Sequence, residues 1–309
     1  MKPDRPPARD ESVRELVGGS FVALASLQFG AVVILGKLIA GRGLPIPAML
    51  AVRFALAGAL LAVVLALSGM GLGAARGERL RLVLLGGVGY AAESALFFFA
   101  LRYGTAAAIT LLFFTYPVWV AVLSAAMGMG LPGRLVIGSL VMTIAGASLV
   151  VASSGGLDVT VAGVVLAFGA AVTFSLYLVG AERTVRDTSS PAAAMWVSTS
   201  AAAGLAIYAL IGAQARLPSG AGEWLPVGAM GAFTAGAFFC LFAGLRRIGA
   251  VRTSIVASLE PVAAALLALI FLDEPLGAGV VAGGVLILAA AIAASVARGG
   301  VTEAEAPAP

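Results

Sequence analysis

The chain is built from about ten apolar stretches separated by short polar breaks, and this pattern constrains its fold more than any other feature. Each stretch has the roughly 20 residues that an α-helix needs to cross the hydrocarbon core of a bilayer. The runs are continuous rather than alternating, which favours helices over a barrel. The chain is 61% hydrophobic and 11% charged, whereas soluble domains are about 45–50% apolar and about 25% charged. The sequence therefore predicts an all-α integral membrane protein.

The breaks contain the Gly, Pro, Ser and Asp residues that are typical of turns. Most breaks are short, so consecutive helices are expected to be antiparallel neighbours. Polar tails are expected at residues 1–16 and 299–309, and the first apolar run is too long for a signal peptide. The expected spans cover residues 17–39, 47–69, 80–101, 104–126, 133–153, 159–181, 191–213, 224–245, 250–272 and 276–297.

The two halves of the chain match each other at a constant offset of 144 residues. Each half has a Leu-Arg pair, then a hydroxyl residue, then a proline inside a span. Since five spans is an odd number, a repeated second half must lie upside down in the membrane, as in many carriers with one central site. The sequence predicts ten helices in two inverted repeats, residues 17–156 and 157–298. The matching residues are Leu101, Arg102, Thr110 and Pro117 in the first half, and Leu245, Arg246, Ser254 and Pro261 in the second.

The positions of the basic residues predict the orientation. With the amino terminus in the cytoplasm, 14 of the 19 Lys and Arg fall on the cytoplasmic side, 4 fall outside, and Arg53 lies within a span. Cytoplasmic loops of membrane proteins carry this excess of positive charge. We therefore expect a multi-pass protein of the cytoplasmic (inner) membrane with both termini cytoplasmic. Because the basic residues lie in these loops, the net charge of +4 does not indicate a nucleic-acid partner.

The residue types that are absent exclude several kinds of chemistry. The chain has no histidine and one cysteine, Cys240. Histidine proton relays, histidine-ligated metals, Ser–His triads, intrachain disulfides and thiolate clusters are therefore excluded. No cofactor, metal or catalytic residue is predicted. The expected partners are a small-molecule substrate and the lipid bilayer, with the protein as a monomer or homodimer.

Several ordered stretches resemble the EamA family of the drug/metabolite transporter superfamily. They are Gly36-Lys37, Arg53-Phe54-Ala55, ALRYGTAAA (100–108) before LLFFTYPVWVAVLSA (111–125), and LRRIGAVRTS (245–254) before SLEPVAAALLALIFLDEPL (258–276). The resemblance covers nearly the whole chain. It implies ten helices in two inverted halves and export of amino acids or other small metabolites. The chain departs from the family pattern in the first half, where Met127-Gly128-Met129-Gly130 lacks the carboxylate that Glu274 supplies in the second.

Polar residues inside the third expected span form the first candidate site. Tyr90, Glu93, Ser94 and Phe97 have the i, i+3, i+4, i+7 spacing that places them on one helix face. A charge within a membrane helix is costly unless it has a partner, water or a function. This face suits a cavity that binds an amphipathic solute. The alternative is a structural pair between Glu93 and Arg53, and both interpretations can hold together.

The two mid-span prolines mark the second candidate region, because each removes a backbone donor and leaves carbonyls free to face a cavity. Thr115, Tyr116 and Trp119 surround Pro117, and their side chains can stack on a solute or simply pack. Glu260, next to Pro261, can bind a substrate ammonium or take up a proton, or it can be a protonated structural residue. The weaker candidates are Ser254 and Ser258 beside Pro261, and Tyr177 in the sixth span.

Lys37 and Arg53 lie toward the predicted outer side of the first two spans. Either can attract a substrate carboxylate or gate the outer mouth, although Lys37 can also extend to the lipid headgroups.

Taken together, the candidate residues predict a secondary transporter that exports a small amphipathic metabolite, such as an amino acid, by alternating access. The alternatives are an intramembrane enzyme acting on lipid and a non-transporting membrane scaffold. The enzyme would need a nucleophile or metal motif that the spans lack.

Overall fold

The computed structural model describes residues 8–127, 134–153, 159–257, 259–274 and 276–299. Over these residues the regular structure is helical, apart from one isolated bridge between Gly104 and Val159. Six of the described helices are long and apolar enough to cross a bilayer, and further apolar helices are shorter. The predicted all-α membrane architecture of ten helices in two repeats is confirmed.

The helices of the first half follow the expected spans, with the third and fourth spans subdivided. The third span is continuous but contains a π-helical turn, η1, and the fourth is broken into two helices. The elements are α1 (Ala8–Ala40), α2 (Ile46–Leu67), α3 (Arg79–Leu84), η1 (Leu85–Tyr90), α4 (Ala91–Ala100), α5 (Ala106–Phe113), α6 (Tyr116–Ala126) and α7 (Arg134–Ser153).

In the second half, the eighth expected span and the start of the ninth are two helices that meet at a kink of non-helical backbone. The kink lies at Gly249, whose φ of 73° is in the left-handed region that glycine adopts without steric cost. The elements are α8 (Val161–Thr184), α9 (Ser190–Ile211), α10 (Gly220–Ala257), α11 (Leu259–Phe271) and α12 (Ala278–Gly299).

The amino-terminal segment differs from the expected flexible tail, because α1 already begins at Ala8. The residues before the first apolar run include Ala8, Arg9, Glu11 and Arg14, which are all good helix formers. They extend the apolar helix by about two turns, since adding residues to an existing helix avoids the cost of nucleation.

The fourth span breaks where Pro117 predicts it. The break separates Phe113 from Tyr116. Pro117 lies in the first turn of α6, where a proline is tolerated because no intrahelical partner is needed for its missing N–H. The equivalent break at Pro261 stays a prediction, because residue 258 lies outside the described residues.

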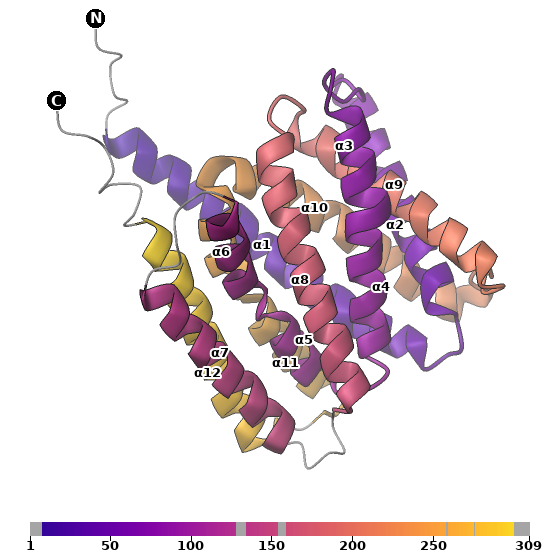
Figure 1. Ribbon diagram of the computed structural model, residues 1–309. Helices are drawn as coiled ribbons and strands as arrows, with labels where there is room; N and C mark the ends of the chain where they lie inside the picture. The colour runs from indigo at the N-terminus through magenta and orange to yellow at the C-terminus, as the bar shows by residue number, and fades with distance from the viewer. Residues whose placement is uncertain (1–7, 128–133, 154–158, 258, 275, 300–309) are drawn as a thin grey trace, which may run out of the picture.

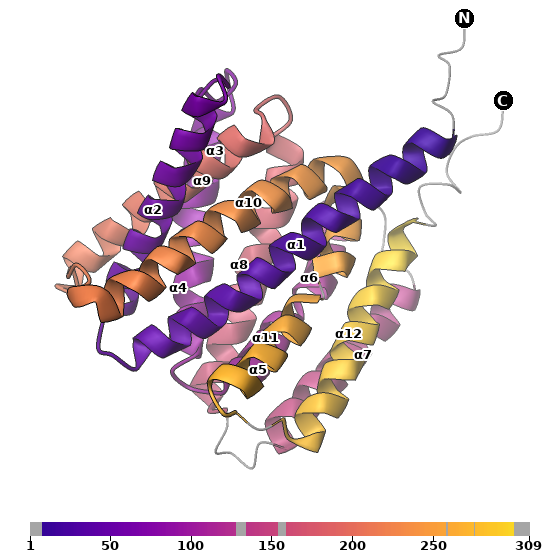
Figure 2. The same cartoon turned by 180° about the vertical axis from the view of Figure 1, so that it is seen from behind.

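The packing of the helices has an approximate two-fold pattern (Figures 1 and 2). Helices that are equivalent in the two repeats pack on each other, α2 on α9 and α7 on α12. The contact of α1 with α10 has its counterpart in the contact of α8 with α4. The start of α1 and the end of α12 lie at the same end of the bundle. This pattern is what two inverted halves produce.

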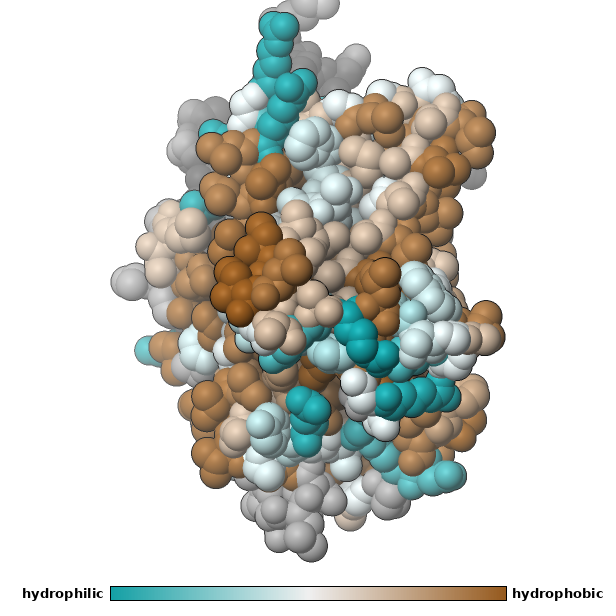
Figure 3. Space-filling view, turned by 90° about the vertical axis from the view of Figure 1, so that its right-hand side faces the viewer, coloured by the Kyte–Doolittle hydropathy of each residue, from teal (hydrophilic) through white to brown (hydrophobic). Residues whose placement is uncertain are grey.

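The outer surface is suited to lipid. In Figure 3 apolar side chains form a broad band, and hydrophilic residues gather above it and in the lower half of the view. Large apolar side chains such as Leu67, Ile211 and Val161 are more than four-fifths exposed. In water such a surface would aggregate, whereas in a bilayer it contacts acyl chains.

Glycines allow η1 and α9 to approach closely. A Cβ at Gly204 would lie 2.1 Å from the carbonyl oxygen of Gly87, and a Cβ at Gly86 would lie 2.4 Å from that of Val197. Small residues at such contacts are typical of membrane helix interfaces. The glycines of this region are therefore explained by packing.

A buried carboxylate, Glu78, ties together three segments at the predicted cytoplasmic end. Its oxygens accept hydrogen bonds from the backbone N–H groups of Arg186, Asp187 and Thr188 at 2.7, 2.9 and 3.0 Å. The Thr188 hydroxyl also donates to it, at 2.5 Å. Arg246 of α10 donates to the Thr188 carbonyl at 2.8 Å. The loop between α8 and α9 is thereby held against the start of α3.

We expect Glu78→Gln to destabilise the protein by about 2–3 kcal/mol at pH 7, since hydrogen bonds to a charged group contribute roughly 1.5–3 kcal/mol each. Burial raises the pKa of the Glu78 carboxyl, but the hydrogen bonds outweigh burial and lower the pKa to about 2. A lowered folded-state pKa gives stability that is present above the ordinary carboxyl pKa and is lost as the pH falls toward 2. Thermal unfolding in detergent should therefore show a smaller difference between wild type and variant at pH 3 than at pH 7.

Candidate functional site

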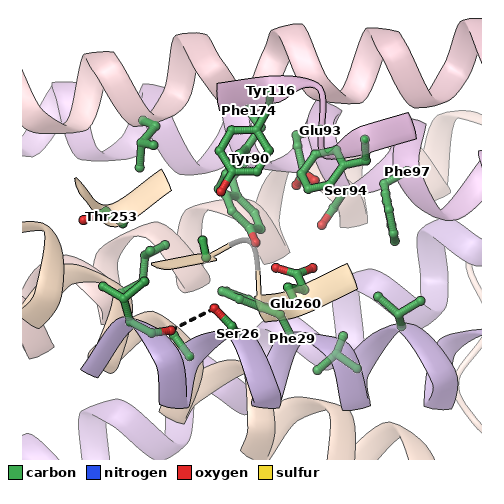
Figure 4. Close-up of a pocket in the computed structure, with 18 of the residues that line it drawn as sticks. Ser26, Phe29, Tyr90, Glu93, Ser94, Phe97, Tyr116, Phe174, Thr253 and Glu260 are labelled. Carbon is green, nitrogen blue, oxygen red and sulfur yellow. Dashed lines mark hydrogen bonds between the residues drawn. The ribbon is translucent and has the colours of Figure 1, made fainter. Parts of the chain in front are cut away.

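A cavity lies in the middle of the bundle, where the two halves meet. It contains about 630 Å³ of space between atoms, with open solvent at its mouth included. Residues from α1, α2, η1, α4, α5, α6, α8, α10 and α11 line it. Glu93 and Ser94 lie on one side and Ser26 and Phe29 on the other, with Glu260 pointing between them (Figure 4).

Arg53 supplies the positive charge of the cavity. Its side chain is buried, with 2% of its surface exposed. Its Nε donates to the Thr234 hydroxyl at 2.7 Å, and its guanidinium lies over the rings of Phe54 and Phe98 at 4.5 and 5.4 Å. Its Nη1 has no hydrogen-bond partner among the described residues. One face of this cation is therefore anchored, while one donor is available to a solute or water.

Two carboxylates, Glu93 on α4 and Glu260 on α11, share the cavity with Arg53. The Arg53 guanidinium interacts electrostatically with Glu93, Glu260 and Tyr90. One interpretation of the sequence was a direct ion pair between Arg53 and Glu93. The described residues form no such ion pair. The Arg53 side chain is hydrogen-bonded to Thr234 instead. The Oε2 atom of Glu93 is buried without a hydrogen-bond partner. A buried polar atom without a hydrogen-bond partner raises the free energy of the folded state. In this cavity such atoms indicate that a ligand or water binds here.

Aromatic rings form the walls between these charges. Tyr116 and Phe174 meet edge to face with ring centroids 4.8 Å apart. Phe113 contacts Phe97 at 5.1 Å and Tyr116 at 5.4 Å. The Phe113–Tyr116 pair is tilted and the other two are edge to face, and such aromatic pairs are favourable and hold the rings in place. The walls therefore present apolar and aromatic surface around a polar centre.

About half of the candidate residues meet in this cavity. The lining includes seven of them: Arg53, Tyr90, Glu93, Ser94, Phe97, Tyr116 and Glu260. They come from five elements of both halves of the chain. Their placement is compatible with the binding roles expected for them, which stay predictions.

Other candidates lie outside the lining. Thr115 is fully buried with its hydroxyl unpaired, and Trp119 packs against the apolar core. Tyr177 is one layer back, with its ring 5.0 Å from that of Tyr90. Ser258 lies outside the described residues, and the structure describes only the backbone of Ser254 and Pro261.

The first span was expected to contribute to the cavity, but no residue of the α1 face that lines it was named from the sequence. Val22, Ala25, Ser26, Phe29, Val32 and Val33 all line the cavity. They occupy one helix face at spacings of three and four residues, so the signal was present in the sequence. It is hidden because an apolar cavity wall and an apolar packing face have the same composition.

Lys37 is held at the predicted outer end of the bundle. Its Nζ lies 2.5 Å from Oε1 of Glu274 and donates to the Gly104 carbonyl at 2.9 Å. The other carboxylate oxygen of Glu274 accepts from the Ala106 N–H at 2.9 Å, at the start of α5. The two side chains are only 23% and 13% exposed. This ion pair links α1, the start of α5 and the segment that follows α11, so Lys37 has a partner within the protein.

The two-repeat pattern seen in the fold is matched by a family model. The model described as EamA-like transporter family matches the chain twice, over residues 16–152 and 161–296. The chain belongs to this family. EamA proteins are generally membrane transporters, and the two matched segments correspond to the two halves described above. The resemblance seen in the sequence is thus confirmed.

Solved structures show the same fold as this EamA chain. One crystal structure is 22% identical in sequence and has a TM-score of 0.65. The matched region covers 94% of this chain and 98% of the chain in that structure. At this identity the similarity establishes the fold alone. A search of curated proteins found no match.

Proposed function

We propose that the protein is a secondary transporter that exports a small zwitterionic, amphipathic metabolite, such as an amino acid, from the cytoplasm. The observation that carries this proposal is the cavity, where Arg53 faces Glu93 and Glu260 between aromatic walls. Nη1 of Arg53 and Oε2 of Glu93 are both buried without partners. A zwitterion has the two complementary groups, since its carboxylate fits the guanidinium and its ammonium fits a carboxylate.

The aromatic walls suit the rest of such a solute. Phe97, Phe113, Tyr116 and Phe174 offer an apolar surface next to the charged groups. Burying the solute's apolar part there contributes roughly 25 cal/mol per Å². The charges then orient the solute, and the rings select for its apolar body.

Alternating access would use the two repeats, residues 17–156 and 157–298. The helix break between Phe113 and Tyr116 lies at the cavity, which both residues line, and carriers typically form their substrate sites at discontinuous helices of this kind. Lys37 and Glu274 would close the outer mouth. At the predicted inner end, Arg183 donates at 3.4 Å to the Met127 carbonyl, and the Glu78 network and Arg246 hold the loop between α8 and α9.

Orientation follows from the charge bias, with both termini in the cytoplasm and Lys37 outside. The Lys37–Glu274 ion pair then closes the outer mouth of the bundle. A carrier that rests closed to the outside is suited to load its solute from the cytoplasm.

Reconstitution into liposomes tests the proposal. With a panel of labelled amino acids, we expect flux of those with apolar or aromatic side chains and none of their N-acetylated forms, because acetylation removes the ammonium. The double variant Glu93→Gln/Glu260→Gln should lose flux, since no carboxylate is left for the ammonium. The matched control is Asp273→Asn, an acid-to-amide change at an exposed residue outside the cavity. Equal flux of free and N-acetylated amino acids would refute the proposal.

A further inference from the structure

The charged residues that line the cavity do not balance. Arg53 is the only basic side chain among the described lining residues, whereas Glu93 and Glu260 are both acidic. If both carboxylates were ionised, the cavity would carry one uncompensated negative charge. A charge buried at membrane depth is costly, and two neighbouring carboxyl groups relieve this cost by sharing a proton.

Among the described lining residues, the elements packed around the two carboxyl groups supply no other counter-charge. The lining residues of α1 and α8 are uncharged, α10 contributes the Thr253 hydroxyl, and η1 and α6 contribute the phenols of Tyr90 and Tyr116. Tyr177 lies behind Tyr90. The empty cavity is therefore neutral only when Glu93 and Glu260 hold one proton between them.

This balance treats two kinds of solute differently. A zwitterion has no net charge, so the cavity remains neutral only if it keeps the shared proton. A monocationic amine adds one positive charge and neutralises the cavity only if the proton leaves. Arg53 does not require a substrate carboxylate, because Thr234 and the rings of Phe54 and Phe98 already hold it in place.

We propose that the cavity also takes a second class of substrate, amphipathic monocationic amines, each in exchange for one proton. This inference rests on the proposed function, because it uses the same cavity. The ammonium takes the place of the proton between Glu93 and Glu260. The proton leaves to water as the carboxyl group ionises, and no covalent bond of the amine changes. Both forms of the cavity, with proton or with amine, are neutral, so the exchange moves no net charge.

Calorimetry in buffers of different ionisation enthalpy tests the proposal, because it counts protons released on binding. With purified protein in detergent at pH 7, we expect about one proton released per bound 2-phenylethylamine and about none per bound phenylalanine. Either Glu93→Gln or Glu260→Gln should abolish proton release and weaken amine binding roughly 30-fold or more. In each variant the charge of the remaining carboxylate is already balanced by that of Arg53, so no negative charge is left for the amine. Asp273→Asn should behave as wild type.

The outcomes separate the two proposals. Phenylalanine binding without amine binding, or amine binding without proton release, overturns this inference and leaves the proposed function intact. Equal proton release by both ligands also overturns it. Failure of both ligands to bind overturns this inference and counts against an amino acid carrier.

Discussion

Proteoliposomes that contain Arg53→Met should lose zwitterion flux by a factor of roughly 100 or more, because truncating a buried, hydrogen-bonded charge costs about 2–5 kcal/mol. Methionine keeps much of the side-chain volume but removes the donor for the substrate carboxylate. It also leaves Glu93 and Glu260 without the guanidinium they face. Initial rates of labelled amino acid uptake measure the loss.

The matched control for Arg53→Met is Arg102→Met, which makes the same change at an exposed loop residue and should leave flux close to wild type. Arg53→Lys should recover only part of the flux, since an ammonium cannot bind Thr234 and a carboxylate with the fork geometry of a guanidinium. Binding of 2-phenylethylamine should be affected less than that of phenylalanine, because the amine has no carboxylate. If Arg53→Met transports amino acids within threefold of wild type, Arg53 is not the carboxylate site.

The second large effect is expected at the outer end, where Lys37→Glu should lower flux about tenfold. The substitution places a carboxylate against Glu274, whose oxygen lies 2.5 Å from the lysine nitrogen. Repulsion between like charges that are partly buried should prevent the outer mouth from closing. The same assay of initial uptake rates measures the effect.

The charge-reversed double variant Lys37→Glu/Glu274→Lys provides the control. It should restore flux only partly, because a lysine at position 274 cannot accept the hydrogen bond from the Ala106 N–H. A double variant no better than Lys37→Glu would show that the ion pair itself is unimportant. Full activity of Lys37→Glu alone would remove the proposed outer closure.

The spans, the repeat and the helix break at Pro117 could be predicted because their causes are local. Hydrocarbon requires long apolar helices, so composition alone locates most of them. The break follows from Pro117, because proline lacks an N–H and cannot continue a helix from the preceding turn. The kink at Gly249 was expected as a break between spans. There the chain stays helical on both sides, because glycine adopts the required positive φ at no cost.

The charged cavity was predictable only in part. Glu93 and Glu260 are conspicuous in the sequence because a bilayer excludes unpaired carboxylates. Their partner was less evident, since an Arg53–Glu93 pair and an Arg53–Thr234 hydrogen bond are equally compatible with the spacing. The α1 wall could not be distinguished from a packing face, because both are apolar on one side of a helix.

By itself, the sequence determined that this chain is a membrane protein of two related halves, with acidic and aromatic residues inside its spans. These properties depend on composition, periodicity and the offset between repeats, which are visible along the chain. Only the tertiary structure decided that Arg53 is held by Thr234, that Lys37 pairs with Glu274, and that α1 closes the cavity. Periodicity tells which residues share a helix face, but contacts between helices far apart in the chain depend on how those faces pack in three dimensions.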